Sequence, residues 1–353
     1  MLIASLCRMG SRRSSYLYYR LNSTYIRRMR YLFELKEDDD ICKQAYNSGS
    51  FFLFYKLSPF VQQEGEMWLA PRINVSDLKR LLKKFKESEE RIEESMLVGC
   101  SEVCTPYFAL DLGSLEKSAL ESELNGSFRE LRKAFFLLEE EDRSLISKAQ
   151  ALLRWHDNNR YCSKTGQPTV KNLAGSKRVC PSSGAIYYPQ MAPVVIILVT
   201  DGSRCLLVRQ ASFPKGMYSA LSGFCDVGET LEETVRREVA EEVGLEVDSL
   251  CYSSSQHWPF PNSSLMIACH AVVDPQRSMI NVNKQELETA QWFSNEEVEE
   301  ALRMEPKLSK EQTGSLSFWV PPKQAIAHQL MQEWVKNTFH IVQKSSCQSW
   351  PQI

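Results

Sequence analysis

The chain has 353 residues, a formal net charge of −2, 43% hydrophobic residues and 24% charged residues. This composition is that of an ordinary globular protein, and the length suits about two domains. The near-neutral charge offers no basic surface for nucleic acid or for an anionic membrane, so neither partner is expected. Eleven cysteines, an odd number with scattered spacing, favour a reducing compartment over a disulfide framework.

Residues 1–33 differ in composition from the rest of the chain. They contain seven arginines and five serines, and the first acidic residue is Glu34. A segment rich in arginine and serine and free of acidic residues is typical of a mitochondrial transit peptide. We therefore expect a mitochondrial location, with cleavage between about residues 25 and 40. A disordered basic tail is the alternative.

Residues 34–154 are predicted to form an α/β domain that carries no catalytic motif. Strands are expected over 51–57 and 107–112, where apolar residues dominate. A helix capped by Ser76 is expected next, since the following leucines have helical spacing. Two more helices are expected over 128–138 and 145–155.

Residues 155–187 have the layout of a degenerate zinc ribbon. Cys162 and Cys180 each begin a knuckle, but Thr165 and Ser183 stand where the second cysteine of each pair belongs. Two Cys-x-x-Cys pairs at this separation would predict a structural zinc site, whereas hydroxyl groups are poor zinc ligands. We expect the ribbon shape without its ion; His156 as a third ligand is the alternative.

Residues 188–340 are predicted to form the second domain, followed by a tail over 341–353. The longest apolar run near the middle of the chain, 194–199, is too short to span a bilayer and is typical of a buried strand. An Asp-Gly turn should connect it to a second strand over 203–209. Further strands are expected over 246–252 and 265–273.

A helix should begin at the capping box formed by Thr230 and Glu233. Its buried stripe recurs every four residues and comprises Leu231, Val235, Val239 and Val243. Gly244 suits the left-handed residue that ends a helix. The stretch from Gly223 to Leu245 therefore predicts a loop, a helix and a loop.

Three glutamates lie beside this stripe, because Glu238, Glu241 and Glu242 are separated by three and four residues. Like charges at this spacing destabilise a bare helix. A divalent cation such as Mg²⁺ would reverse the penalty, since it binds carboxylates together with substrate phosphates. A solvated glutamate-rich face is the alternative.

The segment Ser255–Ser263 places two prolines around two aromatic residues. Proline lacks a backbone donor and has a fixed torsion, so an irregular, rigid loop is expected here. Such a loop beside the glutamate helix suits the stacking of a flat ring.

The pattern from Gly223 to Leu245 is identified as the Nudix box. Together with Ser255–Ser263 it resembles the NADH pyrophosphatase branch of Nudix hydrolases, with His257 in place of the usual proline. The resemblance covers roughly Trp155 to Trp334. It implies an α+β Nudix fold, in which a mixed β-sheet lies between helices and the box forms a catalytic loop-helix-loop.

The resemblance implies hydrolysis of the diphosphate of NADH, and of NADPH, with reduced forms preferred over oxidised ones. Reduced nicotinamide mononucleotide and AMP (or 2′,5′-ADP) would be the products. It implies Mg²⁺ or Mn²⁺ bound by Glu238, Glu241, Glu242 and Glu286. Phe224 and Tyr188 match residues that sandwich the nicotinamide, Tyr188 from the partner subunit of a homodimer. The other matching substrate-binding residues are Gln256, His257, Trp258, Pro259, Phe260, Pro261, Asn262, Ser263 and Ala327.

Within this interpretation Glu242 is the general base, and Arg237 orients the glutamates through a bidentate contact. Two other functions remain open. One is hydrolysis of a different nucleoside diphosphate derivative, such as ADP-ribose, coenzyme A or NAD-capped RNA. The other is a non-catalytic nucleotide-sensing module, which the intact set of glutamates argues against.

Overall fold

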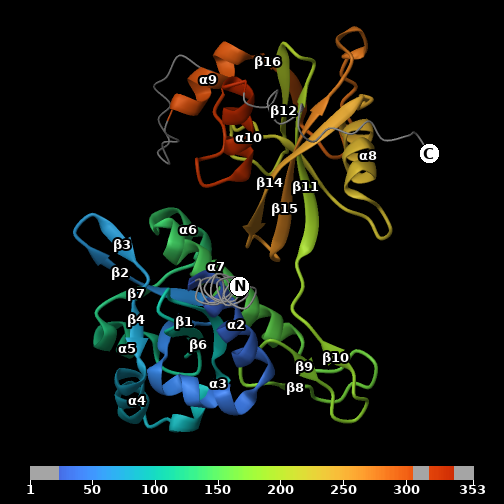
Figure 1. The fold of residues 1–353 in the computed structure, drawn as a ribbon. Helices are drawn as coiled ribbons and strands as arrows, with labels where there is room; N and C mark the ends of the chain where they lie inside the picture. Colours follow the sequence, from blue (N-terminus) through green and yellow to red (C-terminus); the bar gives the residue numbers. More distant parts are fainter. Residues whose placement is uncertain (1–23, 305–317, 338–353) are drawn as a thin grey trace, which may run out of the picture. The chain divides into compact units, whose positions relative to one another are not determined.

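The computed structural model describes residues 24–304 and 318–337. The chain divides into two compact units, Met1–Gln190 and Met191–Ile353, and each contains its own sheets (Figure 1). None of the helices in the described ranges is both long enough and apolar enough to cross a membrane.

The first unit contains a seven-stranded sheet with helices and a small separate sheet. Its elements in chain order are α2 (Thr24–Glu37), α3 (Asp39–Ala45), η1 (Tyr46–Ser48), β1 (Ser50–Tyr55), β2 (Ser58–Glu64), β3 (Met67–Leu69), β4 (Arg72–Asn74), α4 (Val75–Lys84), η2 (Glu89–Glu94), β5 (Met96–Cys100), β6 (Pro106–Asp111), α5 (Lys117–Leu124), β7 (Ser127–Phe128), α6 (Leu131–Leu137), α7 (Glu140–Asn158), β8 (Val170–Lys171), β9 (Arg178–Val179) and β10 (Ile186–Tyr187).

The core of this unit forms around the parallel pair β1 and β6. The sheet order is β3-β2-β1-β6-β5, with β4 paired to β1 and β7 paired to β2. Phe51 of β1 stacks on Phe108 of β6 with ring centroids 5.4 Å apart, and both side chains are fully buried. Aromatic stacking of this kind stabilises the pair beyond simple burial. Both strands predicted for this domain are present, but the first ends at Tyr55, because Lys56 and Leu57 form the turn to β2.

Two local predictions in this unit were wrong. The N-cap of α4 is Asn74 and not Ser76, because Asn74 Oδ1 accepts the amide hydrogen of Asp77 at 2.9 Å. The helix expected over 128–138 begins only at Leu131. Phe128 instead pairs with Phe60 of β2, a contact between distant residues that local periodicity does not reveal.

The helix α2 crosses the predicted boundary between residues 33 and 34. Leu35 is fully buried, Tyr31 packs against the core, and Arg28 Nη2 donates to the carbonyl of Cys100 in β5 at 3.1 Å. Residues 24–33 are thus part of the folded unit.

The second unit is a single mixed sheet with helices on both faces (Figure 1). Its elements in chain order are β11 (Ala192–Thr200), β12 (Arg204–Arg209), β13 (Leu221–Phe224), α8 (Leu231–Val243), β14 (Ser249–Trp258), β15 (Ser264–Val272), η3 (Pro275–Arg277), β16 (Thr289–Ser294), α9 (Asn295–Arg303) and α10 (Ile326–Val335).

The sheet order is β14-β15-β11-β12-β16, and β13 pairs with β11. Successive side chains of a strand point to opposite faces. Val195 and Ile197 of β11 therefore pack with α8, whereas Ile196 and Leu198 pack with α9 and α10. Burial on both faces explains the unbroken apolar run of β11, and the predicted arrangement of a mixed sheet between helices is confirmed.

The segment Ser255–Ser263 is less irregular than expected. Its first four residues form the end of β14, and Trp258 pairs with Ser264 of β15. Only residues 259–263 form a loop, which contains a cis peptide bond between Phe260 and Pro261. The proline at 259 ends the strand but does not disturb the residues before it.

Candidate active site

The helix α8 begins and ends at the predicted residues. Thr230 Oγ1 accepts the amide hydrogen of Glu233 at 3.2 Å, and a Glu233 carboxylate oxygen accepts the amide hydrogen of Thr230 at 2.7 Å. Gly244, with φ of 68°, forms the left-handed C-cap. The valines of the stripe are fully buried, so the helix orientation is fixed and its glutamates lie at the edge of the core.

Arg237 connects the acidic residues of the box. Its Nε and Nη2 atoms donate to the two carboxylate oxygens of Glu229 at 2.6 and 2.9 Å. Its Nη1 atom donates to Glu238 at 2.9 Å and to Glu241 at 3.0 Å. The bidentate partner is therefore Glu229, which our sequence reasoning did not include among the site residues. The sequence could have indicated this role, because Glu229 is one of the glutamates that define the box.

Glu229 joins the loop before α8 to the helix. Besides Arg237, it accepts hydrogen bonds from the amide of Asp226 and the hydroxyl of Thr234, each at 2.9 Å. These donors, Arg237 first, lower the pKa of Glu229 to about 2. The carboxylate consequently stays ionised and holds the guanidinium in one orientation.

Glu238 fits against the backbone of β13 only because residue 223 is glycine. A Cβ atom added to Gly223 would lie 1.8 Å from Cδ of Glu238. The φ angle of Gly223 is not left-handed, so the requirement is for space. Burial raises the pKa of Glu238 despite the adjacent Arg237.

Glu242 is the most deeply buried carboxylate of the site, with 3% of its surface exposed. Its Oε2 atom has no hydrogen-bond partner among the described residues. Burial raises the pKa of Glu242 to about 8, and the negative charges of Glu238 and Glu286 add to the effect. An unpaired buried carboxylate oxygen is costly and indicates a missing partner.

Glu286 reaches the site through a segment bound to the end of α8. The amides of Asn281 and Asn283 donate to the carbonyls of Val243 and Glu242, each at 2.9 Å. These bonds occupy carbonyls that a helix end leaves free. The amide of Glu286 then donates to the carbonyl of Asn283 at 3.2 Å, which fixes the turn that carries Glu286.

The donor set fits a divalent cation. Within residues 24–304 and 318–337, no three His, Cys, Asp or Glu side chains are preassembled around an ion position. Arg237 forms ion pairs with both Glu238 and Glu241 in this arrangement. The partnerless Oε2 of Glu242, the mutual repulsion of the carboxylates and their all-oxygen chemistry are nevertheless what Mg²⁺ or Mn²⁺ requires.

The strand register places the predicted aromatic residues at one end of the sheet. Four residues form one row across the sheet. Phe224 of β13 pairs with Val194 of β11, and Met266 of β15 pairs with Val194 on the other side. Gln256 of β14 pairs with Met266 and ends the row. Adjacent strands are about 4.8 Å apart, so Phe224 and Gln256 are separated by roughly 14 Å across this row. Phe224 is 62% exposed, which leaves its ring accessible.

The tip of the β14–β15 hairpin is internally bonded. His257 Nε2 and Ser263 Oγ are 2.8 Å apart, so the histidine that replaces the usual proline closes the loop. The rings of Trp258 and Phe260 meet edge to face, with centroids 5.4 Å apart. Pro259 is buried, whereas the remaining two predicted residues of the tip, Pro261 and Asn262, are exposed.

Three predicted substrate-binding residues are outside the tip of this hairpin in the sequence. Gln256 donates from Nε2 to the carbonyl of Gln324 at 2.8 Å and accepts the amide hydrogen of Ile326 at 3.0 Å, so its amide secures the start of α10. Ala327 is 2% exposed and packs in the core. Tyr188, which is exposed, belongs to the first unit.

The four knuckle positions of the ribbon converge as in a metal site. The sulfur of Cys162 lies 3.7 Å from the Ser183 hydroxyl, and that of Cys180 lies 3.5 Å from the Thr165 hydroxyl. The hydroxyl of Ser182 is 3.1 Å from Cys180. Hydrogen bonds from these hydroxyls lower the pKa of the Cys180 thiol to about 5.

His156 does not complete this site. Its Nε2 atom is 2.8 Å from the carbonyl of Gly175, and its Nδ1 atom is 3.1 Å from Nη1 of Arg178. Two thiols and two hydroxyls do not fit the usual ligand set of structural zinc.

Three family models match the chain between residues 48 and 313. Residues 190–313 match the NUDIX domain, and residues 48–155 match the NADH pyrophosphatase-like rudimentary NUDIX domain. Residues 157–188 match the NADH pyrophosphatase zinc ribbon domain.

Similar proteins extend over nearly the whole chain. A human mitochondrial protein named NAD(P)H pyrophosphatase NUDT13 is 58% identical, covering 98% of this chain and 99% of its own length. Its mouse counterpart is also 58% identical, covering 94% and 96%. A human NAD-capped RNA hydrolase, NUDT12, is 33% identical and covers 84% of this chain and 69% of its own length. The chain therefore belongs to the Nudix hydrolases of the NADH pyrophosphatase-like type.

Proposed function

We propose that this protein is an NAD(P)H pyrophosphatase that cleaves the diphosphate of NADH into reduced nicotinamide mononucleotide and AMP. NADPH would give 2′,5′-ADP in place of AMP. The observation that carries the proposal is the cluster of glutamates assembled around Arg237, with Glu238 and Glu242 buried beside an exposed Phe224. The names of the similar human and mouse proteins supply the substrate class.

Glu238, Glu241, Glu242 and Glu286 would hold the Mg²⁺ or Mn²⁺. When bound, the cation neutralises charge on the diphosphate and makes a water molecule more acidic. Arg237 keeps Glu238 and Glu241 in position, while Glu229 keeps Arg237 in position. Positioning of this kind lowers the entropic part of the barrier.

Glu242 is the general base in this proposal. In the proposal one oxygen of the Glu242 carboxylate helps to hold the cation, and the other takes a proton from the attacking water. The water oxygen forms a bond to phosphorus, the bond from phosphorus to the bridging oxygen breaks, and the two mononucleotides leave. Phe224, Trp258 and Phe260 offer aromatic faces to a flat ring.

Tyr188 completes the nicotinamide site in the proposal, from the partner subunit of a homodimer. We also keep the preference for reduced nucleotides, which rests on the family alone. Stacking gives no reason for it, because the oxidised nicotinamide carries a positive charge that an aromatic face attracts.

Replacement of Glu242 by glutamine should lower kcat by about 10²–10⁴-fold, the range for loss of a general base. The fold should be retained, because the change removes a buried charge and keeps the shape. Steady-state kinetics with NADH and circular dichroism are the measurements. Glu232→Gln on the same helix is the matched control and should keep full activity. Near-normal turnover of Glu242→Gln would shift the base to Glu241 or Glu286.

Chromatography of the products tests the cleavage site. NADH with Mg²⁺ or Mn²⁺ should yield reduced nicotinamide mononucleotide and AMP. In steady-state kinetics, Trp258→Ala should raise KM for NADH more than it lowers kcat, if the ring binds equally well in the ground state and in the transition state. NADPH, NAD⁺, ADP-ribose, coenzyme A and NAD-capped RNA complete the panel. Release of free nicotinamide, or faster cleavage of ADP-ribose or capped RNA than of NADH, contradicts the proposal.

We propose import into mitochondria, directed by the arginine-rich segment 1–33. The similar human and mouse proteins are named as mitochondrial. Because Arg28 and Tyr31 of α2 contact the first unit, processing should occur before Arg28. A fluorescent protein fused to residues 1–33 should enter mitochondria, and a variant with its arginines changed to glutamine should stay in the cytosol. Diffuse fluorescence of the unchanged fusion refutes import by this segment.

We propose that the ribbon keeps its shape without zinc. Each knuckle turn has its own backbone hydrogen bond, from Gly166 to Cys162 and from Gly184 to Cys180, both 2.8 Å. Hydroxyl protons take the place of the cation beside the sulfurs.

Elemental analysis of the purified protein should give far less than one zinc per chain. The double variant Thr165→Cys/Ser183→Cys should acquire about one, because it restores four thiolates at positions that already converge. Stoichiometric zinc in the unchanged protein, lost on Cys162→Ser, would show that the ribbon still binds its ion.

A further inference from the structure

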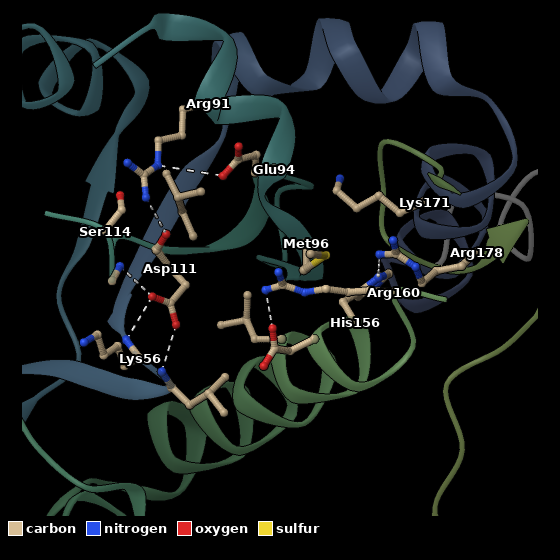
Figure 2. A pocket seen from close by; sticks show the side chains of 15 residues that line it. Lys56, Arg91, Glu94, Met96, Asp111, Ser114, His156, Arg160, Lys171 and Arg178 are labelled. Carbon is tan, nitrogen blue, oxygen red and sulfur yellow. Dashed lines mark hydrogen bonds and ion pairs between the residues drawn. The ribbon is translucent and has the colours of Figure 1, made fainter. Parts of the chain in front are cut away.

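The first unit contains a cavity of about 670 Å³ (Figure 2). All of its lining residues precede the box in the sequence. Its walls come from the turn between β1 and β2, from η2, β5 and β6, from α7 and from the ribbon. This volume is in the range of small-molecule sites. Figure 2 shows Lys56 and Arg91 on one side of it and Lys171, Arg178 and Arg160 on the other.

The cavity is cationic although the whole chain has a charge of −2. Five lysines and arginines line it, against three carboxylates, which leaves an excess of two positive charges. The carboxylate of Asp111 is bonded to the backbone. It accepts hydrogen bonds from the amides of Lys56, Leu57 and Gly113 at 2.8–2.9 Å.

The two other carboxylates have local partners. Glu94 lies 3.8 Å from Arg91, and Asp157 pairs with Arg160 one helical turn away. Neither Lys171 nor Arg178 forms an ion pair with any carboxylate in the described part of the chain. Together with Lys56, whose Nζ atom lies 5.6 Å from the centroid of the Tyr55 ring, they are the lining cations for which the described residues provide no ion pair.

Lys171 is held by neutral groups. Its Nζ atom donates to the carbonyl oxygens of Glu93 at 2.6 Å and of Ser95 at 3.3 Å. Burial lowers the pKa of Lys171 to about 8, and the charge of Arg178 contributes. A nearby anion would restore the stability of the charged form.

Arg178 also has only neutral partners. Its Nε and Nη2 atoms donate to the hydroxyl and carbonyl of Thr169 at 2.6 and 2.8 Å. Its Nη1 atom contacts Nδ1 of His156, whose Nε2 donates to the carbonyl of Gly175. That arrangement makes Nδ1 an acceptor and the imidazole neutral, and burial lowers the pKa of His156 to about 4.

We propose that this cavity binds the phosphate group of a small sugar phosphomonoester. Such a phosphate carries a charge of roughly −1.5 to −2 near pH 7. This charge balances the two excess positive charges of the lining. Arginine and lysine donors suit phosphate oxygens. Among the described lining residues there is no Phe, Tyr or Trp, so the walls suit an aliphatic or sugar body better than a stacked base.

Calorimetric titration of the full chain with ribose 5-phosphate, in the absence of divalent cations, tests the proposal. Arg160→Gln and Lys56→Gln alter exposed lining residues that the core does not need. Each should weaken binding about tenfold, the equivalent of one charge-assisted hydrogen bond. Lys164→Gln, an exposed lysine of the ribbon outside the lining, is the matched control and should bind unchanged.

The same titration with Glu242→Gln separates this site from the glutamate cluster, and its affinity should be unaltered. Absence of binding at millimolar ligand, or equal loss in Lys164→Gln, refutes the site. Inorganic phosphate that binds as tightly as ribose 5-phosphate refutes the assignment to a monoester. Binding of AMP that is tighter than that of ribose 5-phosphate and is weakened by Arg160→Gln refutes the assignment to a sugar body alone.

Discussion

The bidentate contact between Arg237 and Glu229 is the interaction on which the rest of the site depends. The glutamates of α8 repel one another, and a helix with such a face is weakened unless a cation lies nearby. Arg237 supplies one positive charge inside the cluster, and the bond to Glu229 prevents it from rotating away. Because Glu229 precedes the helix, the same contact also fixes the loop that leads from Gly223 into α8.

Local signals in the sequence were sufficient for the helix of the box. Its cap, its valine stripe and its terminal glycine act within a few residues of one another, and all were predicted. The identity of the partner of Arg237 was not, because side-chain pairing across a loop leaves no periodicity. The end of β14 was missed for a related reason, since Trp258 is held in a strand by Ser264, which lies beyond the prolines.

Residues inferred from the family divide according to their neighbours in the structure. Phe224 is exposed beside the glutamates. The side-chain amide of Gln256 instead forms two hydrogen bonds with the backbone at the start of α10. The sequence pattern marks both positions equally, and only the hydrogen-bond partners separate a contacting role from a supporting one. The cavity of the first unit was beyond sequence reasoning altogether, because Lys171 and Arg178 approach α7 through the ribbon.

Uncompensated charge is the common property of the two candidate sites. The box concentrates carboxylates around a single arginine, and the cavity concentrates cations around carboxylates that are already engaged. Charges buried in this way cost stability, so each indicates a ligand of the opposite sign.

The attachment of Asn281 and Asn283 to the end of α8 has a consequence for the length of the chain between β15 and β16. Surface connections usually tolerate insertions. Here the backbone bonds that close the helix end also set the position of Glu286, only three residues after Asn283. Insertions before Asn281 can bulge outward, whereas a single added residue between Asn283 and Glu286 would displace the carboxylate from Glu242. The tolerance to insertion should therefore change abruptly within one short connection.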